Sequence, residues 1–344
     1  MATLTAPDAG YVVPPPDSAS LVAWPADFGT RFTVFVDTEE EFDWDAPLTR
    51  DTHATTAIAA LPETHRRFAE HGVPLTFMVD YPIVTDPFAV DILRAALADG
   101  MSAIGTQLHA WVNPPFDEPL SPTNSYAGNL PPALEAAKLD TLGEAITAAF
   151  GAAPRVYRAG RYGIGPATVA LLGERGYRID SSMRARYSYA QDGGPDFRAI
   201  GNHAFRIGNL VELPLTTVFT GRAARWGTPL YDRLGAVPKG RGVFARAGLL
   251  SRVALTPEDM PLNDALEAVA VAVGEGVRVL NFSFHSPSLE PGHTPYVRDA
   301  ADLAAFHHWW ERIFADLARR GIRAVSLDAL IEASAPLPAT RPIR

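Results

Sequence analysis

The alternation of short apolar segments with longer amphipathic ones is the feature that most limits the folds open to this chain. Segments 31–37 (RFTVFVD) and 277–285 (VRVLNFSFH) are apolar or β-branched on both faces, which is typical of strands buried in a sheet. Segment 61–72 has a helical pattern, with Pro62 suited to the first turn and Gly72 to the end. Strands with two apolar faces, separated by helices, predict a parallel sheet that is covered by helices.

The number of such strands favours a closed or nearly closed sheet. We count seven or eight at the spacing of a (β/α) barrel, and we predict an irregular barrel of that kind. An open doubly wound sheet is the alternative, but no glycine-rich phosphate loop follows the first strand, and the glycines of GRYGIG (160–165) do not match the dinucleotide-binding or P-loop spacings. The other predicted strands are 73–80, 101–109, 155–160, 177–183 and 323–330, with a hairpin at 203–217.

The composition excludes several kinds of site and partner. The 344 residues are 47% hydrophobic and 20% charged, which is sufficient for a large core. The formal net charge of −9 disfavours non-specific binding to nucleic acid or to anionic membranes, because both require basic patches. The chain has no cysteine, so disulfides and thiolate chemistry are excluded, and any metal ion must be bound by nitrogen and oxygen ligands.

The chain is expected to form one domain with irregular ends. Residues 1–28 are rich in Pro and Ala and predict an N-terminal arm, residues 29–335 a single barrel domain, and residues 336–344 a C-terminal tail. The first residues lack a basic region followed by an apolar one, and no segment reaches about 18 consecutive apolar residues. We therefore expect no secretion signal, no transmembrane helix and a cytoplasmic location.

Polar residues end several of the predicted strands. Asp37, Asp80, His109, Asp180 and His285 lie at or near such ends. In a parallel barrel the carboxyl ends of the strands converge on one face, where the active sites of these folds lie. For Asp80 and Asp180 an alternative is equally good, because a carboxylate at this position often caps the next turn. The pattern predicts a site at this face of the barrel, but it does not indicate the reaction.

The acidic segment DTEEEFDW (37–44) contains residues with different expected roles. Asp37 follows a strongly apolar run and should be partly buried, so it must be paired, protonated or bound to a cation. Glu40 is predicted to lie in a solvated turn. His285 ends its strand as Asp37 does, and a carboxylate and an imidazole at two strand ends fit a general base and a general acid.

Six segments occur in order along about residues 30–330: FTVFVDTEEEFDW, GVPLTFMV, IGTQLHAWVNPPF, YRAGRYG, ELP and FSFHSPSLEPGHTPYV. Together they resemble the NodB-like polysaccharide deacetylases of carbohydrate esterase family four, in particular the WalW-type branch. The resemblance implies a deformed (β/α) barrel with seven or eight strands that hydrolyses an N- or O-linked acetyl group on a sugar. It also implies one divalent metal ion, which in the family is held by an aspartate and two histidines.

The resemblance implies roles for individual residues. Asp37 matches the general base, Arg158 the arginine that orients it, and His285 the general acid that protonates the leaving amine. Arg161 and Tyr162 match the start of the substrate-facing turn, where the backbone N–H of Tyr162 could help to form an oxyanion hole. Further candidates for substrate binding are Trp111, Glu212 and His293.

The metal ligands of the family are not all present. Thr38, Gln107 and Trp111 occupy the positions of its metal-binding aspartate and two histidines. One interpretation is a rebuilt site in which Glu39 and His109 are ligands and Gln107 or water completes the set, and such ligands suit Zn²⁺ or a similar ion. The other interpretation is loss of the metal ion, as in the cofactor-free amide hydrolases of the allantoinase-like branch, whose corresponding motif also contains a tryptophan.

The sequence therefore predicts a hydrolase that removes an acetyl group from a sugar or polysaccharide. The alternatives are a metal-independent hydrolase of C–N (amide) bonds and a non-catalytic sugar-binding relative. The expected partner is a carbohydrate and not nucleic acid. The sequence indicates neither the sugar and its linkage nor the oligomeric state.

Overall fold

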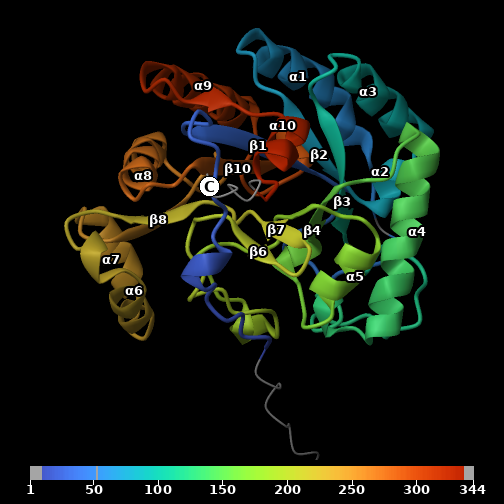
Figure 1. Cartoon of the computed structure of the whole chain (residues 1–344), viewed down its shortest axis with the longest axis horizontal. Helices are drawn as coiled ribbons and strands as arrows, with labels where there is room; N and C mark the ends of the chain where they lie inside the picture. Colours follow the sequence, from blue (N-terminus) through green and yellow to red (C-terminus); the bar gives the residue numbers. More distant parts are fainter. Residues whose placement is uncertain (1–9, 52, 337–344) are drawn as a thin grey trace, which may run out of the picture.

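The computed structural model describes residues 10–51 and 53–336, and its centre is a curled, mainly parallel sheet (Figure 1). The strands follow the order β10-β1-β2-β3-β4-β5-β7-β6, and β11 also pairs with β1. Neighbouring strands are parallel except for β6 and β7. This arrangement confirms the predicted irregular (β/α) barrel. The strands are β1 (Arg31–Thr38), β2 (Leu75–Val79), β3 (Ala103–Leu108), β4 (Val156–Ala159), β5 (Ile179–Asp180), β6 (Phe205–Ile207), β7 (Leu210–Glu212), β10 (Val279–His285) and β11 (Arg323–Ala324).

Helices cover the convex side of the sheet. Figure 1 shows α1, α3 and α9 along one part of it and α4 along another. The aromatic run at 306–310 lies in α9, and the ring centroid of Trp310 is 5.8 Å from that of Phe282 in β10, so this run packs in the core as predicted. The helices around the sheet are α1 (Leu61–Glu70), α2 (Tyr81–Thr85), α3 (Pro87–Leu97), α4 (Pro132–Phe150), α5 (Thr168–Glu174), α8 (Leu262–Gly274), α9 (Ala300–Arg319) and α10 (Leu327–Ala333).

The two sides of the sheet have separate apolar cores. Val34 belongs to the core beneath the helices, whereas Phe35 belongs to a second core on the concave side. Because side chains alternate along a strand, Asp37 lies on the same side as Phe35. The same alternation places Gln107, which is in β3, and His109, which directly follows β3, on one side of the sheet. The concave side thus changes from apolar to polar toward the carboxyl ends of the strands.

Two predictions in the second half of the chain have opposite outcomes. The hairpin at 203–217 is confirmed, since β6 and β7 pair antiparallel around Gly208, whose φ is 56°. The prediction of a strand at 323–330 is wrong beyond β11, because the chain turns into α10 (Leu327–Ala333). The Oγ atom of Ser326 accepts a hydrogen bond from the backbone N–H of Ala329 and caps α10, so the capping residue outweighs the apolar pattern.

A second sheet, which was not predicted, consists of β8 (Thr217–Thr220) and β9 (Ser251–Ala254). Between these strands lie α6 (Gly227–Gly235) and α7 (Gly240–Arg246). The segment that leads from β7 to β8 is bonded to β10, because the Nδ2 atom of Asn281 donates to the carbonyl oxygen of Leu213 at 3.0 Å. The two ends of the main sheet are therefore linked through this segment.

The described part of the predicted N-terminal arm contacts the barrel. Val12 and Leu21 form isolated β-bridges with Asp196 and Phe205. Residues 1–9 of the predicted arm, and the predicted tail beyond Pro336, lie outside the described residues. Across residues 10–51 and 53–336, no helix combines the length and the apolar character that crossing a membrane requires.

Candidate active site

A cavity of about 260 Å³ lies at the carboxyl ends of β1, β3, β4 and β10. Aromatic rings form much of its wall, including those of Trp44, Trp111 and Tyr296. The polar side chains in the lining include Asp37, Glu39, Gln107, His109, Arg158 and His285. The structure thus brings residues from four separate strand ends to one cavity.

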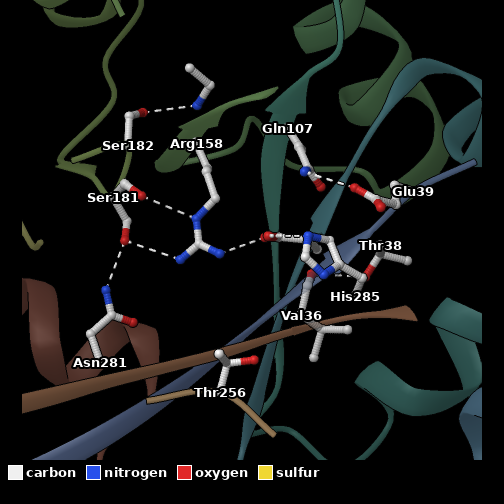
Figure 2. Close-up of polar contacts among 12 residues, drawn as sticks. Val36, Thr38, Glu39, Gln107, Arg158, Ser181, Ser182, Thr256, Asn281 and His285 are labelled. Carbon is white, nitrogen blue, oxygen red and sulfur yellow. Dashed lines mark hydrogen bonds and ion pairs between the residues drawn. The ribbon is translucent and has the colours of Figure 1, made fainter. Parts of the chain in front are cut away.

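Asp37 is held by a buried arginine. It ends β1 directly opposite His285 of β10, and its side chain is buried. An Nη atom of Arg158 donates to Oδ1 of Asp37 at 2.5 Å. The Nε of Arg158 donates to the carbonyl oxygen of Ser181 at 3.1 Å (Figure 2). The Oγ of Ser181 accepts from both Arg158 and Asn281, at 3.2 and 2.9 Å. These bonds fix the guanidinium, and the guanidinium in turn orients the carboxylate of Asp37.

His285 is held by Glu258, a residue that the sequence analysis missed. The Nδ1 of His285 lies 2.7 Å from Oε2 of Glu258, and its Nε2 lies 3.6 Å from Oδ2 of Asp37. The other oxygen of Glu258 accepts bonds from the backbone N–H of His285 at 3.0 Å and from the hydroxyl of Ser288 at 2.6 Å. Burial opposes the charge of His285, but Glu258, Glu39 and Asp37 together raise its pKa to about 10. His285 is therefore an imidazolium at neutral pH.

The chain gave one weak signal for Glu258. It follows the apolar run of β9, as the other site residues follow theirs, but β9 was not predicted as a strand. Burial would raise the pKa of the Glu258 carboxyl, yet the charge of His285 and the bonds from His285 and Ser288 lower it. Glu258 therefore remains charged beside the imidazolium.

Glu39 faces the cavity beside His109. Its Oε2 lies 3.1 Å from the Nε2 of Gln107, which donates to it, and 3.4 Å from the Nε2 of His109 (Figure 2 shows the bond between Glu39 and Gln107). Its Oε1 and the Oε1 of Gln107 are buried without a partner. Burial raises the pKa of Glu39 to about 7. The three residues predicted to hold a metal ion therefore lie together, and two of them each have one unpartnered oxygen atom.

Glu40 is buried, and the prediction that it lies in a solvated turn is wrong. Only 1% of it is exposed, because its Oε2 bonds the Nδ1 of His109 at 2.7 Å and its backbone N–H donates to Asp80 at 2.8 Å. Asp80 also accepts from the backbone N–H of Ile83 and caps α2, which confirms the capping alternative for this residue. Burial raises the pKa of Glu40 to about 8 and that of Asp80 well above its ordinary value.

A buried set of metal-ligating atoms results from this arrangement. Glu40, Asp80 and His109 each offer one atom, and these atoms lie within 4.8 Å of one another. Both oxygen atoms of Asp80 already accept backbone N–H groups, and the Nδ1 of His109 bonds Glu40. In metal sites a carboxylate commonly accepts the second ring N–H of a histidine ligand and leaves the other nitrogen free to bind the ion. Glu40 is bonded in this way to the Nδ1 of His109, and the Nε2 of His109 lies toward Glu39.

Comparisons with known proteins rest on structure alone. No family model matches this sequence, and no curated protein matches it. A crystal structure assigned as a polysaccharide deacetylase from Mycobacterium smegmatis superposes on 94% of this chain and 98% of its own, with a TM-score of 0.52 and 19% identity. This is the polysaccharide deacetylase fold. The chitin deacetylase of Colletotrichum lindemuthianum superposes on 96% of this chain and 95% of its own, with a TM-score of 0.46 and 13% identity.

Two of the positions that the sequence resemblance assigns to metal ligands, Thr38 and Trp111, do not fit a metal ion here. The hydroxyl of Thr38 donates to the carbonyl oxygen of Val36 at 3.0 Å, and the indole of Trp111 stacks on the ring of His109 with centroids 4.2 Å apart. The neighbouring set fits better, because Glu39 and His109 supply oxygen and nitrogen donors and the unpartnered oxygen of Gln107 lies beside them. The residues present thus fit an ion on the Glu39 side of His109.

The candidate substrate-binding residues divide into two groups. Arg161, Tyr162 and Trp111 line the cavity, and the first two have φ angles of 54° and 60°, a left-handed conformation that is strained for residues with side chains. Glu212 and His293 are absent from the lining. Glu212 is fully buried and accepts the backbone N–H of Met183, and His293 pairs with Glu41 at 3.0 Å. Both side chains thus have partners within the protein.

Gly160 permits the close approach of β4 to His109. A Cβ atom on Gly160 would lie 2.5 Å from Cδ2 of His109 and 2.7 Å from the carbonyl oxygen of Leu108. Gly160→Ala is expected to destabilise the protein by about 1–3 kcal/mol in urea unfolding, because the ring and the backbone must move apart. Gly143→Ala in α4 is the control, since its Cβ would meet nothing within 4 Å. Equal unfolding midpoints for both variants would show that the packing around His109 is not tight.

Proposed function

We propose that this chain hydrolyses an acetamide or acetyl ester group on a carbohydrate. The observation that carries the proposal is the pairing of Asp37 with His285 across the ladder of β1 and β10, at the floor of an aromatic cavity. One residue of the pair is a carboxylate and the other an imidazolium, which are the base and the acid that acyl hydrolysis requires. The deacetylase fold supports this reaction class. The WalW-type branch remains a prediction.

Asp37 is proposed to be the general base. One of its oxygen atoms is held by Arg158, and the other faces His285 at 3.6 Å. A water molecule in the cavity beside Oδ2 would give its proton to Asp37 and attack the carbonyl carbon of the acetyl group. Arg158 is not proposed to act as an acid, and its role is to orient the carboxylate of Asp37.

His285 is proposed to be the general acid. Its raised pKa keeps the Nε2 proton in place at neutral pH, and Glu258 keeps the ring oriented through Nδ1. When the tetrahedral intermediate breaks down, the proton on Nε2 passes to the leaving nitrogen or oxygen of the sugar. A divalent cation held by Glu39, His109 and Gln107 would add polarisation of the acetyl oxygen. The aromatic rings of Trp44, Trp111 and Tyr296 offer flat apolar surfaces to a sugar ring.

The second candidate is a metal-independent amide hydrolase. The sequence resemblance matches Thr38 and Trp111, neither of them a usual metal ligand, to two of the family's metal-binding positions, and this match favours the second candidate. Acetate release from N-acetylglucosamine oligomers and acetylated xylo-oligosaccharides, with and without a chelator, tests both candidates. Acetate release that stops when chelator is added supports the metal-dependent deacetylase. Chelator-resistant hydrolysis of a small amide, with no acetate release from sugars, supports the second. Binding of the oligosaccharides without hydrolysis would instead identify a non-catalytic relative.

Metal content distinguishes an ion on the Glu39 side of His109 from an ion on the Glu40 side. Glu39→Gln is expected to lower the bound divalent metal at least tenfold, because it removes a charged ligand. Glu40→Gln should retain the ion with roughly 10- to 100-fold weaker affinity, as for partners that only orient a ligand. Elemental analysis and titration with Zn²⁺ measure both, with Glu41→Gln as the control. If Glu40→Gln abolishes the metal and Glu39→Gln does not, the ion occupies the Glu40–Asp80–His109 set.

A further inference from the structure

An insertion between β8 and β9 is not used by the proposed reaction. Residues 221–250 contain α6 and α7, which project from one side of the molecule in Figure 1. The insertion has a small core of its own, formed by Ala223, Leu234 and Leu250 with Phe219 of β8. None of its residues lines the cavity that contains Asp37. The insertion therefore needs an explanation that is separate from catalysis.

The insertion is strongly basic within an acidic chain. It contains six Lys or Arg residues and one acidic residue, Asp232, so its net charge is +5, whereas that of the whole chain is −9. Asp232 is also paired with Arg198, which lies outside the insertion, at 3.1 Å. Within the described ranges, Arg241 is the one cation of the set that has a carboxylate within 4 Å. The six exposed cations are Arg222, Arg225, Arg233, Lys239, Arg241 and Arg246.

Large apolar side chains are exposed among these cations. Trp226, Val237 and Val243, all within the insertion, are 54%, 55% and 58% exposed. Leu230 and Arg233, three residues apart, share one face of α6, and Trp226 directly precedes this helix. With Phe244 and Leu249 they line an open groove of about 740 Å³, and the guanidinium of Arg225 lies 4.3 Å from the ring of Trp226.

We propose that the α6–α7 insertion docks on the surface of an anionic lipid bilayer. Unpaired cations attract the acidic headgroups, and the exposed tryptophan and valines can enter the boundary between headgroups and acyl chains. Tryptophan is enriched at that boundary because its ring is apolar and its N–H is polar. A nucleic acid would match the cations, but its phosphate backbone offers no partner for Val237 and Val243, so the lipid surface matches more of the observed chemistry.

The net charge of the chain does not oppose this docking. A charge on the surface acts over about one Debye length, roughly 8–10 Å at physiological ionic strength. The headgroups beneath the insertion therefore interact mainly with its own cations, and only weakly with the acidic remainder of the chain. The composition disfavoured binding to anionic membranes because it was judged from the net charge of the whole chain. That net charge conceals the local excess of positive charge in the insertion.

Vesicle flotation of the full chain tests the proposal. The protein is expected to float with phosphatidylcholine vesicles that contain about 30% phosphatidylglycerol, but not with phosphatidylcholine alone, and to be released when salt rises from about 0.1 to 1 M. The triple variant Arg222→Gln/Arg225→Gln/Arg233→Gln should bind on the order of a hundredfold more weakly, since each cation near the surface contributes roughly fivefold. Arg66→Gln/Arg94→Gln/Arg298→Gln is the control with the same change in charge, and it should bind as the unaltered chain does.

A second measurement examines the apolar contact directly. Trp226 should be quenched by lipids brominated near the headgroup, and Trp226→Phe should remove that part of the quenching while the other tryptophans report unchanged folding. The proposal is overturned if the chain does not float with the anionic vesicles, or if both triple variants lose binding equally. Binding to duplex DNA or to polyphosphate without binding to vesicles would also overturn it, and would show that the insertion recognises a soluble polyanion.

Discussion

Replacing Asp37 by asparagine is expected to lower kcat/KM for acetate release by about 10²- to 10⁴-fold, the usual contribution of a positioned general base. Asparagine has nearly the same size and can still accept the bond from Arg158, so the cavity should keep its shape. What it lacks is the ability to take a proton from water. The measurement is the rate of acetate release from the acetylated saccharide that the unaltered enzyme uses.

The control for this variant is Asp45→Asn, which removes a charge from the same loop at an exposed position outside the cavity. A thermal melt of both variants is also needed, because Asp37→Asn leaves Arg158 buried without a charged partner. Breaking a buried ion pair costs about 3–5 kcal/mol when nothing replaces it, and the retained hydrogen bond should reduce that cost. If folded Asp37→Asn retains full activity, Asp37 is not the base.

Glu258→Gln is expected to shift the alkaline limb of the pH–rate profile downward by about one to three units. His285 must be protonated to act as an acid, so activity is complete below its pKa and is lost as the pH rises through that pKa. The Glu258 charge helps to raise this pKa from 6.5 to about 10. Without that charge the pKa falls, and the loss of activity begins closer to neutral pH.

Stability should respond with the same sign. The folded-state pKa of His285 is above its unfolded value, so the protonated histidine contributes stability below pH 6.5 that is lost as the pH rises toward about 10. Glu258→Gln should reduce this dependence, whereas Glu311→Gln, at an exposed position on α9, should change neither profile. An unchanged alkaline limb in Glu258→Gln would mean that another group controls the protonation of the acid.

Much of the fold could be predicted because its strands are apolar on both faces. This pattern located β1 and β10, and with them the strand ends that bear Asp37 and His285. The insertion and its two short strands were not predicted, since β9 is four residues long and its first two residues are only half-buried. The same gap explains why Glu258 was missed, because no strand end indicated it.

The side chains around His109 show a second limit of the sequence. Consecutive acidic residues suggest a solvated turn, yet the backbone N–H of Glu40 donates to Asp80 and this bond turns its side chain inward. Asp80 is distant in the sequence, so no local pattern could reveal the contact. For Glu212 the resemblance indicated a groove wall, whereas in the structure its side chain accepts the backbone N–H of Met183 and does not line the cavity.

The ladder between β1 and β10 also bears on how the protein is made. Asp37 lies near the beginning of the barrel and His285 near its end, yet the two are direct neighbours in the sheet. During synthesis on the ribosome, β1 can pair early with β2, but almost the entire domain must be made before β10 emerges. Such distant pairing folds slowly, because a long stretch of chain must be ordered before the contact forms. The acid and the base therefore meet only in a completed barrel, and a chain interrupted before β10 cannot contain a working pair.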